Sequence, residues 1–178
     1  MALLSRRASF PCTPHMPQLS EDPDAREGEQ RVLSNVQEHG VHIVHVPEDE
    51  KGPGFSYTVG LFPGHAQSEI IVFGLPRDVS HTLLNEASAL VREGSRFEAG
   101  AESADLLHGY LCVFRQVPER HHSVFLGWAQ WLNGYRPLSA VQLFYPDRNG
   151  RWPWDPDVTQ QFASQQPILE REPVPDWA

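Results

Sequence analysis

One short apolar segment limits the fold more than any other feature of the sequence. Residues 69–75, EIIVFGL, are apolar after the first position, and Pro76 follows them directly. A continuous apolar run of this length is typical of a strand in the middle of a sheet that is buried on both faces. Each face then needs a covering layer, and a chain of 178 residues is long enough to build a core of that size.

Further segments predict the rest of the sheet. Runs rich in aromatic and β-branched residues predict four more strands, at residues 41–46, 55–61, 110–117 and 138–145. The links between the first three strands are short, which favours an antiparallel meander. Residues 95–108 show no clear pattern. We therefore expect a mostly antiparallel sheet of five to six strands, either open or closed into a small barrel.

Apolar residues at helical spacing predict the covering layers. Residues 28–39 form one amphipathic segment, and Gly40 stands where a left-handed helix cap belongs. The clearest helix is predicted over residues 79–93, and a second long helix over residues 119–132. Together with the strands, these segments predict an α+β domain with two long helices.

Prolines near both ends of the chain limit the folded part. Proline lacks a backbone N–H and is excluded from helix interiors and central strands. Residues 1–26 are therefore predicted to be an irregular N-terminal arm, and residues 156–178 a Pro-rich C-terminal tail with at most a short helical turn near residues 158–163. The single folded domain is expected to span residues 27–155.

Composition excludes several classes of partner. Lys and Arg total 14 and Asp and Glu total 23, so the formal charge is 14 − 23 = −9. An acidic chain argues against binding to nucleic acid or to an anionic membrane surface, because both need a basic face. The sequence shows no membrane span and no signal peptide, so we expect a cytoplasmic protein. Of its two cysteines, Cys112 is predicted to be a buried thiol and Cys12 an exposed one.

The densest group of candidate ligand-binding residues lies around the loop before residue 69. Backbone amides near a glycine and a nearby hydroxyl can hold an anionic or carbonyl-bearing ligand. The alternative is that Tyr57 and Thr58 are ordinary strand residues and that His65 is a solvated loop residue. Glu69, at the head of a buried strand, is expected to reach a loop amide or His65. The candidates are Tyr57, Thr58, Gly60, His65 and Glu69.

A second group lies in the segment YPDRNGRWPWD at residues 145–155. Trp152 and Trp154 can form the wall of a ligand site or plug one end of the sheet. Asp147 can orient a partner side chain or simply hold its own turn. We expect one pocket between the 57–69 edge and the 145–154 turn.

Motifs of established chemistry do not settle the activity. Neither pair of close histidines, at 42 and 45 or at 121 and 122, is spaced to chelate on a strand or helix. The sequence contains no HExxH, no Cys/His zinc pattern, no phosphate-binding glycine loop and no G-x-S-x-G. We therefore predict no metal site, and the sequence leaves open whether the protein is an enzyme.

Three stretches together resemble a bacterial family of unknown function, DUF4262. They are GPGFSYTVGLFPGH at residues 52–65, EIIVFGLP at residues 69–76 and QLFYPDRNGRWPWD at residues 142–155. The resemblance covers residues 29–155. It brings no activity with it, so it implies a fold but no reaction.

The order of the elements also resembles that of flavin-reductase-like split barrels. That resemblance implies FMN as a cofactor. Thr58, Gly60 and the loop at residues 62–68 would then face the flavin phosphate, and Trp152 or Trp154 would stack on the ring.

Three functions therefore follow as hypotheses. The first is a binding module for a small molecule or a protein, with its pocket between the two candidate segments. The second is a flavin-dependent or other small-ligand enzyme. The third is an acidic immunity-type protein that neutralises a basic toxin, since the net charge would steer a cationic partner.

Overall fold

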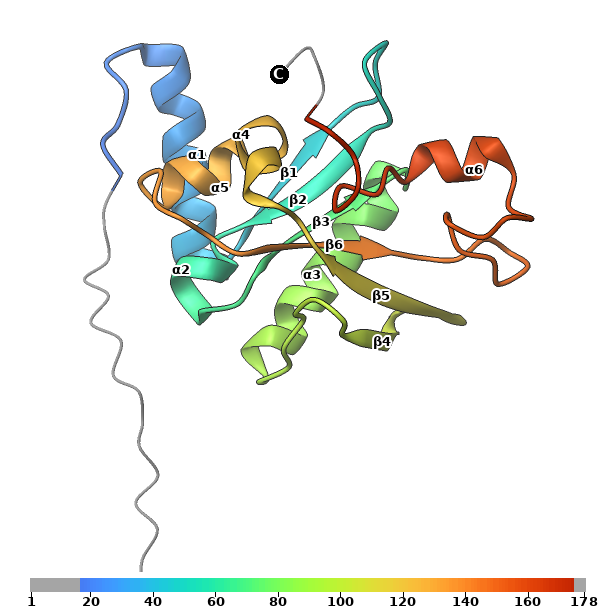
Figure 1. The fold of residues 1–178 in the computed structure, drawn as a ribbon. Coiled ribbons are helices and arrows are strands. Elements are labelled where there is room, and N and C mark those ends of the chain that lie inside the picture. The colour runs from blue at the N-terminus through green and yellow to red at the C-terminus, as the bar shows by residue number, and fades with distance from the viewer. Residues whose placement is uncertain (1–16, 175–178) are drawn as a thin grey trace, which may run out of the picture.

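A computed structural model describes residues 17–174 and has one six-stranded sheet at its centre (Figure 1). The strands lie in the order β1-β2-β3-β6-β5-β4, and all neighbours are antiparallel except β3 and β6. The predicted α+β class and mostly antiparallel sheet are confirmed, and the sheet is open, so the barrel alternative does not form. The strands are β1 (His42–Val46), β2 (Phe55–Val59), β3 (Glu69–Phe73), β4 (Glu102–Leu107), β5 (Tyr110–Gln116) and β6 (Ala140–Phe144).

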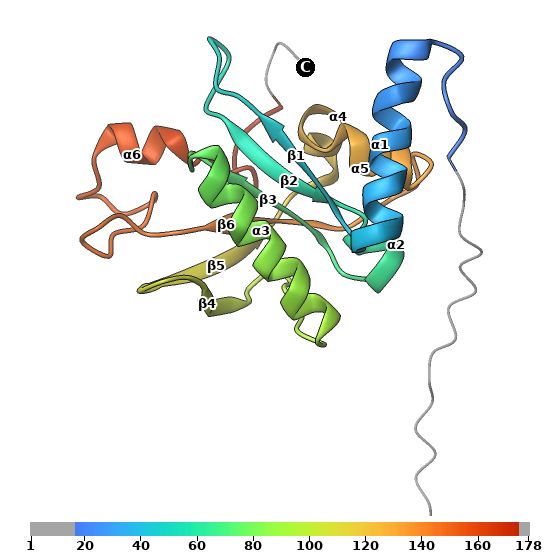
Figure 2. The ribbon, with the colours of Figure 1, turned by 180° about the vertical axis from the view of Figure 1, so that it is seen from behind.

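Helices cover both faces of the sheet. Figure 2 shows α3 crossing one face, and Figure 1 shows α4 and α5 in front of the other, with α1 beside the β1 edge. None of the described helices is long and apolar enough to cross a bilayer. The helices are α1 (Pro23–His39), α2 (Leu61–His65), α3 (Arg77–Arg92), α4 (His122–Phe125), α5 (Gly127–Leu132) and α6 (Gln160–Gln165), with a 3-10 turn at Glu119–His121.

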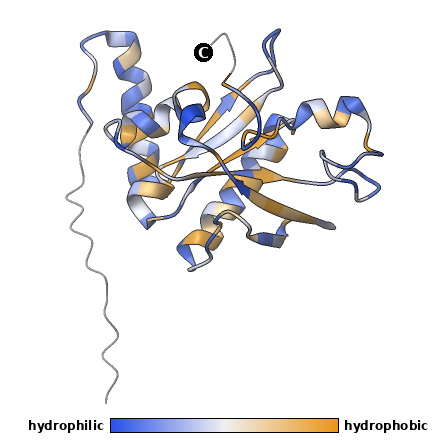
Figure 3. Cartoon of the chain, viewed as in Figure 1, coloured by the Kyte–Doolittle hydropathy of each residue, from blue (hydrophilic) through white to orange (hydrophobic). Residues whose placement is uncertain are grey.

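The core has two halves, one on each face of the sheet. Alternate residues of β3 enter different halves: Ile70 and Val72 pack with α3, while Ile71 and Phe73 pack with α4 and α5. The strand predicted at residues 69–75 is therefore buried on both faces, as expected. Figure 3 shows the hydrophobic colour most strongly on β5 and β6, whereas α1 and α6 are mixed. Cys112 is also buried, as predicted, and burial raises its pKa to about 11.

The first helix begins earlier than the sequence pattern indicates. Asp22 caps α1 by accepting a hydrogen bond from the amide of Asp24, and Pro23 occupies the first turn, where its missing N–H is not needed. Four residues of the predicted arm, 23–26, are thus helical, and residues 1–16 lie outside the described part. The helix ends at Gly40, whose φ of 80° confirms the predicted left-handed cap.

The second long helix predicted at residues 119–132 is divided into shorter pieces. The backbone at Leu126 leaves the helical region (φ −126°, ψ 34°), which separates α4 from α5. The apolar residues of this segment cover too wide an arc for one straight helix to bury them all on one sheet. Leu126 at the change of direction is itself buried, in the same half of the core as Phe125, Trp131 and Leu132.

Strand β4 was not predicted, although it lies within the ambiguous stretch at residues 95–108. It is an edge strand with mostly exposed or partly exposed residues and an irregular register against β5. Polar edge strands carry little apolar alternation, so periodicity does not reveal them.

The C-terminal segment packs against the sheet despite its prolines. The Gln142 side chain on β6 donates to the carbonyl of Pro167 and accepts from the amide of Leu169. Leu169 is buried, and α6 places Phe162 against Tyr145. Irregular chain is therefore held here by side-chain hydrogen bonds, and it forms one wall of a pocket.

Candidate functional site

Glu69 is the centre of the first candidate group. Its Oε2 accepts from the Thr58 hydroxyl at 2.7 Å, and its Oε1 accepts from the amides of Gly60 at 2.8 Å and Phe62 at 3.1 Å. The Thr58 oxygen in turn accepts from the amide of Ile70 at 2.9 Å. The expectation that Glu69 reaches a loop amide is met twice, and the carboxylate fixes the link between β2, α2 and β3.

Burial dominates the electrostatics of this carboxylate. Loss of water raises the pKa of Glu69 from its ordinary 4.5 to about 7, and the bonds from Thr58 and the loop amides only partly oppose that rise. The same donors were expected to face a flavin phosphate. In the structure Glu69 already occupies them, and a second anion there would meet its charge.

Tyr57 and His65 do not join this network. Tyr57 is buried in the half of the core that contains α4 and α5, where its hydroxyl accepts from the amide of Trp128 at 3.3 Å, and burial raises its pKa to about 12. His65 is the last residue of α2 and is half-buried. Of the first five candidates, the structure therefore brings together Thr58, Gly60 and Glu69.

Asp147 holds its own turn. Its Oδ1 accepts from the amides of Asn149 at 2.8 Å and Arg151 at 2.9 Å, and its Oδ2 accepts from the Arg151 guanidinium at 2.7 Å. These bonds from Arg151 lower the pKa of Asp147 to about 2. This agrees with the turn alternative considered for the residue.

The two tryptophans form a stacked group at the end of β6. Trp152 and Trp154 are parallel with ring centroids 5.2 Å apart, and Trp154 packs edge-on against Phe144. The Arg115 guanidinium carbon lies 3.8 Å from the centre of the Trp154 ring, a cation–π contact. This arrangement covers part of the sheet, which is the plug alternative.

The structure does not bring these two groups side by side. Glu69 pairs with Ala140 at the start of β6, whereas the 145–154 turn follows the end of that strand. The groups thus lie at opposite ends of the parallel β3–β6 pair, and none of their proposed site residues lines either pocket described below. The parallel pairing explains this separation. Because β3 and β6 run in the same direction, the start of β3 lies beside the start of β6, away from the turn that follows β6.

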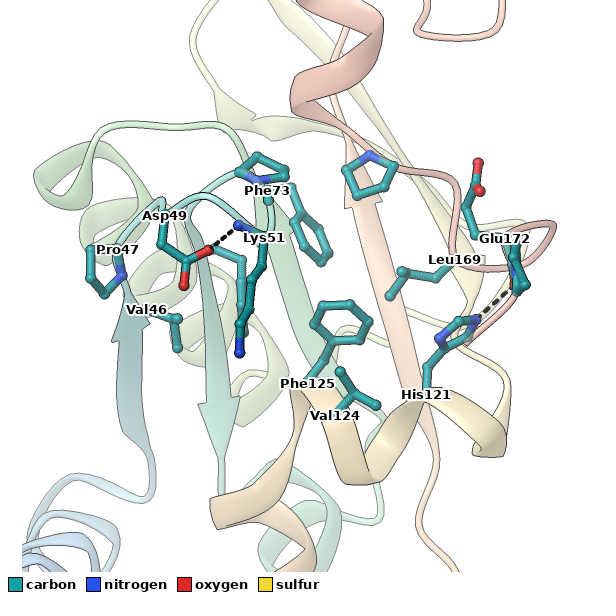
Figure 4. A pocket seen from close by; sticks show the side chains of 15 residues that line it. Val46, Pro47, Asp49, Lys51, Phe73, His121, Val124, Phe125, Leu169 and Glu172 are labelled. Carbon is teal, nitrogen blue, oxygen red and sulfur yellow. Dashed lines mark hydrogen bonds between the residues drawn. The ribbon is translucent and has the colours of Figure 1, made fainter. Parts of the chain in front are cut away.

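A pocket of about 480 Å³ lies elsewhere, beneath the hairpin that joins β1 and β2 (Figure 4). We call it the hairpin pocket. Its walls come from the hairpin, from the 3-10 turn and the end of α4, and from the C-terminal segment. Most of its lining is apolar, and the lining residues are Val46, Pro47, Asp49, Lys51, Gly52, Pro53, Phe55, Phe73, His121, Val124, Phe125, Pro167, Leu169, Glu172 and Pro173.

His121 is the buried polar group of this pocket. The side chain is 0% exposed, and its Nε2 lies 3.0 Å from the carbonyl oxygen of Glu172. A carbonyl only accepts, so Nε2 carries the proton and Nδ1 of the neutral ring carries a lone pair. Nδ1 has no hydrogen-bond partner among residues 17–174. Figure 4 shows the ring on the same side of the pocket as Leu169, across from Phe125.

Sequence reasoning missed this site. It considered His121 only as half of a chelating pair with His122, and the structure gives each ring its own carbonyl, that of Glu172 or of Val117. Two histidines at the start of an apolar helix were the available signal. Nothing local indicated that residue 172 would return to the same place.

Comparison with known proteins identifies the family of the chain but no individual relative. No curated protein and no solved structure matches it. A family model described as a domain of unknown function, DUF4262, matches residues 35–159, which include all of the strands, α2 to α5 and most of the hairpin pocket. The chain therefore belongs to the DUF4262 family.

Proposed function

We propose that the protein is a binding module whose small-molecule ligand occupies the hairpin pocket. The observation that carries the proposal is the lone pair of His121 Nδ1, buried in a mostly apolar pocket with no partner in the described chain. Buried polar atoms are usually satisfied, and an unsatisfied one costs about 1–3 kcal/mol, so such an atom marks a place where a ligand would be stabilised.

Size and lining define the body of the ligand. Ligand pockets commonly measure about 300–1,000 Å³ and are lined mainly by apolar and aromatic side chains with a few polar groups. The hairpin pocket holds about 480 Å³ and presents Phe55, Phe73 and Phe125. The rings of Phe73 and Phe125 meet edge to face at 5.5 Å. A flat aromatic or compact aliphatic body suits these walls.

The polar groups define the rest of the ligand. His121 Nδ1 accepts, so the ligand needs a hydroxyl or an N–H that reaches it. Asp49 and Lys51 line the pocket from the hairpin loop, and Glu172 lines it from the C-terminal segment. The proposed ligand is therefore an aromatic or aliphatic molecule with one hydrogen-bond donor at its buried end.

Phenol and anisole test this proposal as a matched pair. Both present the same ring, but only phenol donates a hydrogen bond. We expect phenol to bind saturably at millimolar concentration and to shift the nitrogen-15 resonance of His121 Nδ1, and anisole to bind more weakly without that shift. The measurement is a nitrogen-15 NMR titration of the imidazole rings.

Two variants make the result specific. His121→Phe removes the acceptor and should remove the preference for phenol, while His39→Phe changes an exposed histidine at the end of α1 and should retain it. Equal affinities of the wild-type protein for phenol and anisole, or an unmoved His121 resonance at saturation, would overturn the proposal.

A further inference from the structure

A different groove holds a cluster of nucleophilic and basic side chains, and it supports an inference beyond the proposed function. This groove, of about 880 Å³, runs along β1. The start of α3, α1 and Trp128 of α5 also line it, and it shares Val46, Pro47, Pro53 and Phe55 with the hairpin pocket. We call it the α3 groove. Ser56, His45 and Arg77 are among its lining residues.

Three side chains form a hydrogen-bonded chain at this groove. The Ser56 Oγ lies 2.8 Å from His45 Nδ1, and His45 Nε2 lies 3.2 Å from His81 Nδ1. Register explains the first contact, because Ser56 on β2 pairs directly with His45 on β1 and both side chains point to the same face. The second contact comes from α3, which packs against β1 and β2.

Other buried serines of the protein behave differently. Ser88 donates to the carbonyl of Leu84 at 2.7 Å, and Ser80 donates to that of Leu75. A carbonyl satisfies a hydroxyl but does not take its proton. Ser56 instead meets an imidazole, and a nucleophile within about 2.6–3.2 Å of a base that a third group orients is the arrangement of an activated serine.

We propose that Ser56 is a nucleophile, that His45 is its general base, and that the α3 groove accepts acyl esters carrying an anionic group. The hydroxyl oxygen attacks the ester carbonyl while its proton passes to His45 Nδ1. The carbon–oxygen bond to the leaving group then breaks, and His45 returns the proton to the departing alkoxide. Water repeats the sequence on the acylated serine, which releases the acid and restores Ser56.

The protonation state of His45 fits this role. Burial lowers the pKa of His45, and the positive charge of Arg77 and the neighbouring His81 and His42 lower it further, with Asp78 opposing them. The ring is therefore neutral near pH 7 and can accept a proton. When Ser56 donates to Nδ1, the proton of the neutral ring lies on Nε2, from which it reaches His81.

The surroundings favour a negative substrate and a negative intermediate. Arg77 lines the groove and its charge acts on His45, together with the opposing carboxylate of Asp78, whereas Arg31 at the groove is paired with Glu27. Helix α3 is 16 residues long and begins after Pro76 at the groove with no side-chain cap, so the positive end of its dipole lies there, with Asp78 in its first turn. Charge developing on a carbonyl oxygen is stabilised by such groups.

Labelling the full chain with diisopropyl fluorophosphate tests the nucleophile directly. We expect one phosphoryl adduct, mapped by peptide mass spectrometry to Ser56, and no adduct in Ser56→Ala or His45→Gln. Ser88→Ala is the matched control, a buried serine that lacks a histidine partner, and it should label like the wild type. A wild-type protein that stays unlabelled at Ser56, or that labels equally without His45, overturns the proposal.

Ester hydrolysis tests the substrate class. The mono-p-nitrophenyl ester of succinate should react faster than p-nitrophenyl acetate, and Arg77→Gln should remove that preference. Loss of the base should slow hydrolysis about 100-fold or more. Equal rates for the wild type and Ser56→Ala, when circular dichroism shows both folded, would overturn the reaction.

His81 serves as a positioning residue, because it acts through His45. His81→Ala should lower kcat while leaving KM nearly unchanged, and His81→Asn, whose side-chain oxygen can accept in place of Nδ1, should restore most of the rate. If His81 had only a structural role at its exposed position on α3, the two variants should have the same kcat.

Discussion

Two buried ionisable side chains, Glu69 and His121, lie in two regions that treat polar atoms in opposite ways. Around Glu69, both carboxylate oxygens are occupied by donors from β2 and the following loop. In the hairpin pocket, one nitrogen of His121 is bonded and the other has no partner among the described residues. The sequence predicted a ligand site between the Glu69 region and the 145–154 turn. The comparison shows that a dense group of polar residues is compatible with a closed structural network, whereas an unsatisfied polar atom and a lined pocket occur together only around His121 in this pair.

The largest effect is expected from removing the carboxylate. Glu69→Ala leaves the donors of Thr58, Gly60 and Phe62 without their acceptor, and we expect unfolding to become easier by about 5 kcal/mol, since each unsatisfied buried donor costs about 1–3 kcal/mol. Urea denaturation measures the change. Glu69→Gln keeps one acceptor oxygen and should lose less stability than Glu69→Ala. Equal losses of stability for the two variants would show that the hydrogen bonds to Glu69 do not stabilise the fold.

A smaller loss is expected from the wall of the hairpin pocket. Leu169 is 2% exposed and anchors the C-terminal segment in the half of the core that contains α4. Leu169→Ala should cost about 3 kcal/mol in urea denaturation, within the range for buried leucines. It should also weaken phenol binding, because the wall moves. Unchanged affinity for phenol would show that the segment does not shape the pocket.

The charge of Glu69 should appear in the pH dependence of stability. Its pKa is about 7 in the folded protein and 4.5 in ordinary surroundings. Between these values the folded state binds more protons than the unfolded state, so stability falls as pH rises from about 5 to about 7. Urea titrations of the wild type and Glu69→Gln across that range isolate this contribution, because all other groups are shared. If the difference in free energy of unfolding between the wild type and Glu69→Gln stayed constant with pH, that result would contradict the raised pKa of Glu69.

The smallest effect on stability is expected at His121. His121→Phe gives up one hydrogen bond to the carbonyl of Glu172 but keeps an aromatic ring in an apolar site, so the free energy of unfolding should change by no more than about 1 kcal/mol. The same variant should lose the preference for phenol over anisole. A large loss of stability with an unaltered preference for phenol would show that His121, like Glu69, stabilises the fold and does not bind the ligand.

Local patterns predicted most of the regular elements because their causes are local. The apolar run at residues 69–75 became β3, the spacing over residues 79–93 became α3, and Gly40 ended α1. The errors also have local causes. The edge strand β4 lacks apolar alternation, and the segment at residues 119–132 bends at Leu126 to bury apolar residues that surround it.

The candidate site was predicted less well, since its members are distant in sequence. Glu69 was identified together with two of the residues it contacts, Thr58 and Gly60, which are eleven and nine positions away. His121 and Glu172 are separated by 51 positions, and His45 and His81 by 36. No periodicity reports contacts of that range.

The sequence by itself determined which segments become strands and helices, where several of them end, and that β3 is covered on both faces. These follow from backbone preferences and the burial of apolar side chains along a few neighbouring residues. Only the tertiary structure decided that β3 pairs in parallel with β6, that the C-terminal segment closes the hairpin pocket, and that Ser56, His45 and His81 meet. Those outcomes depend on which surfaces pack together after the elements have formed, and packing energy is shared among residues that the chain order keeps apart.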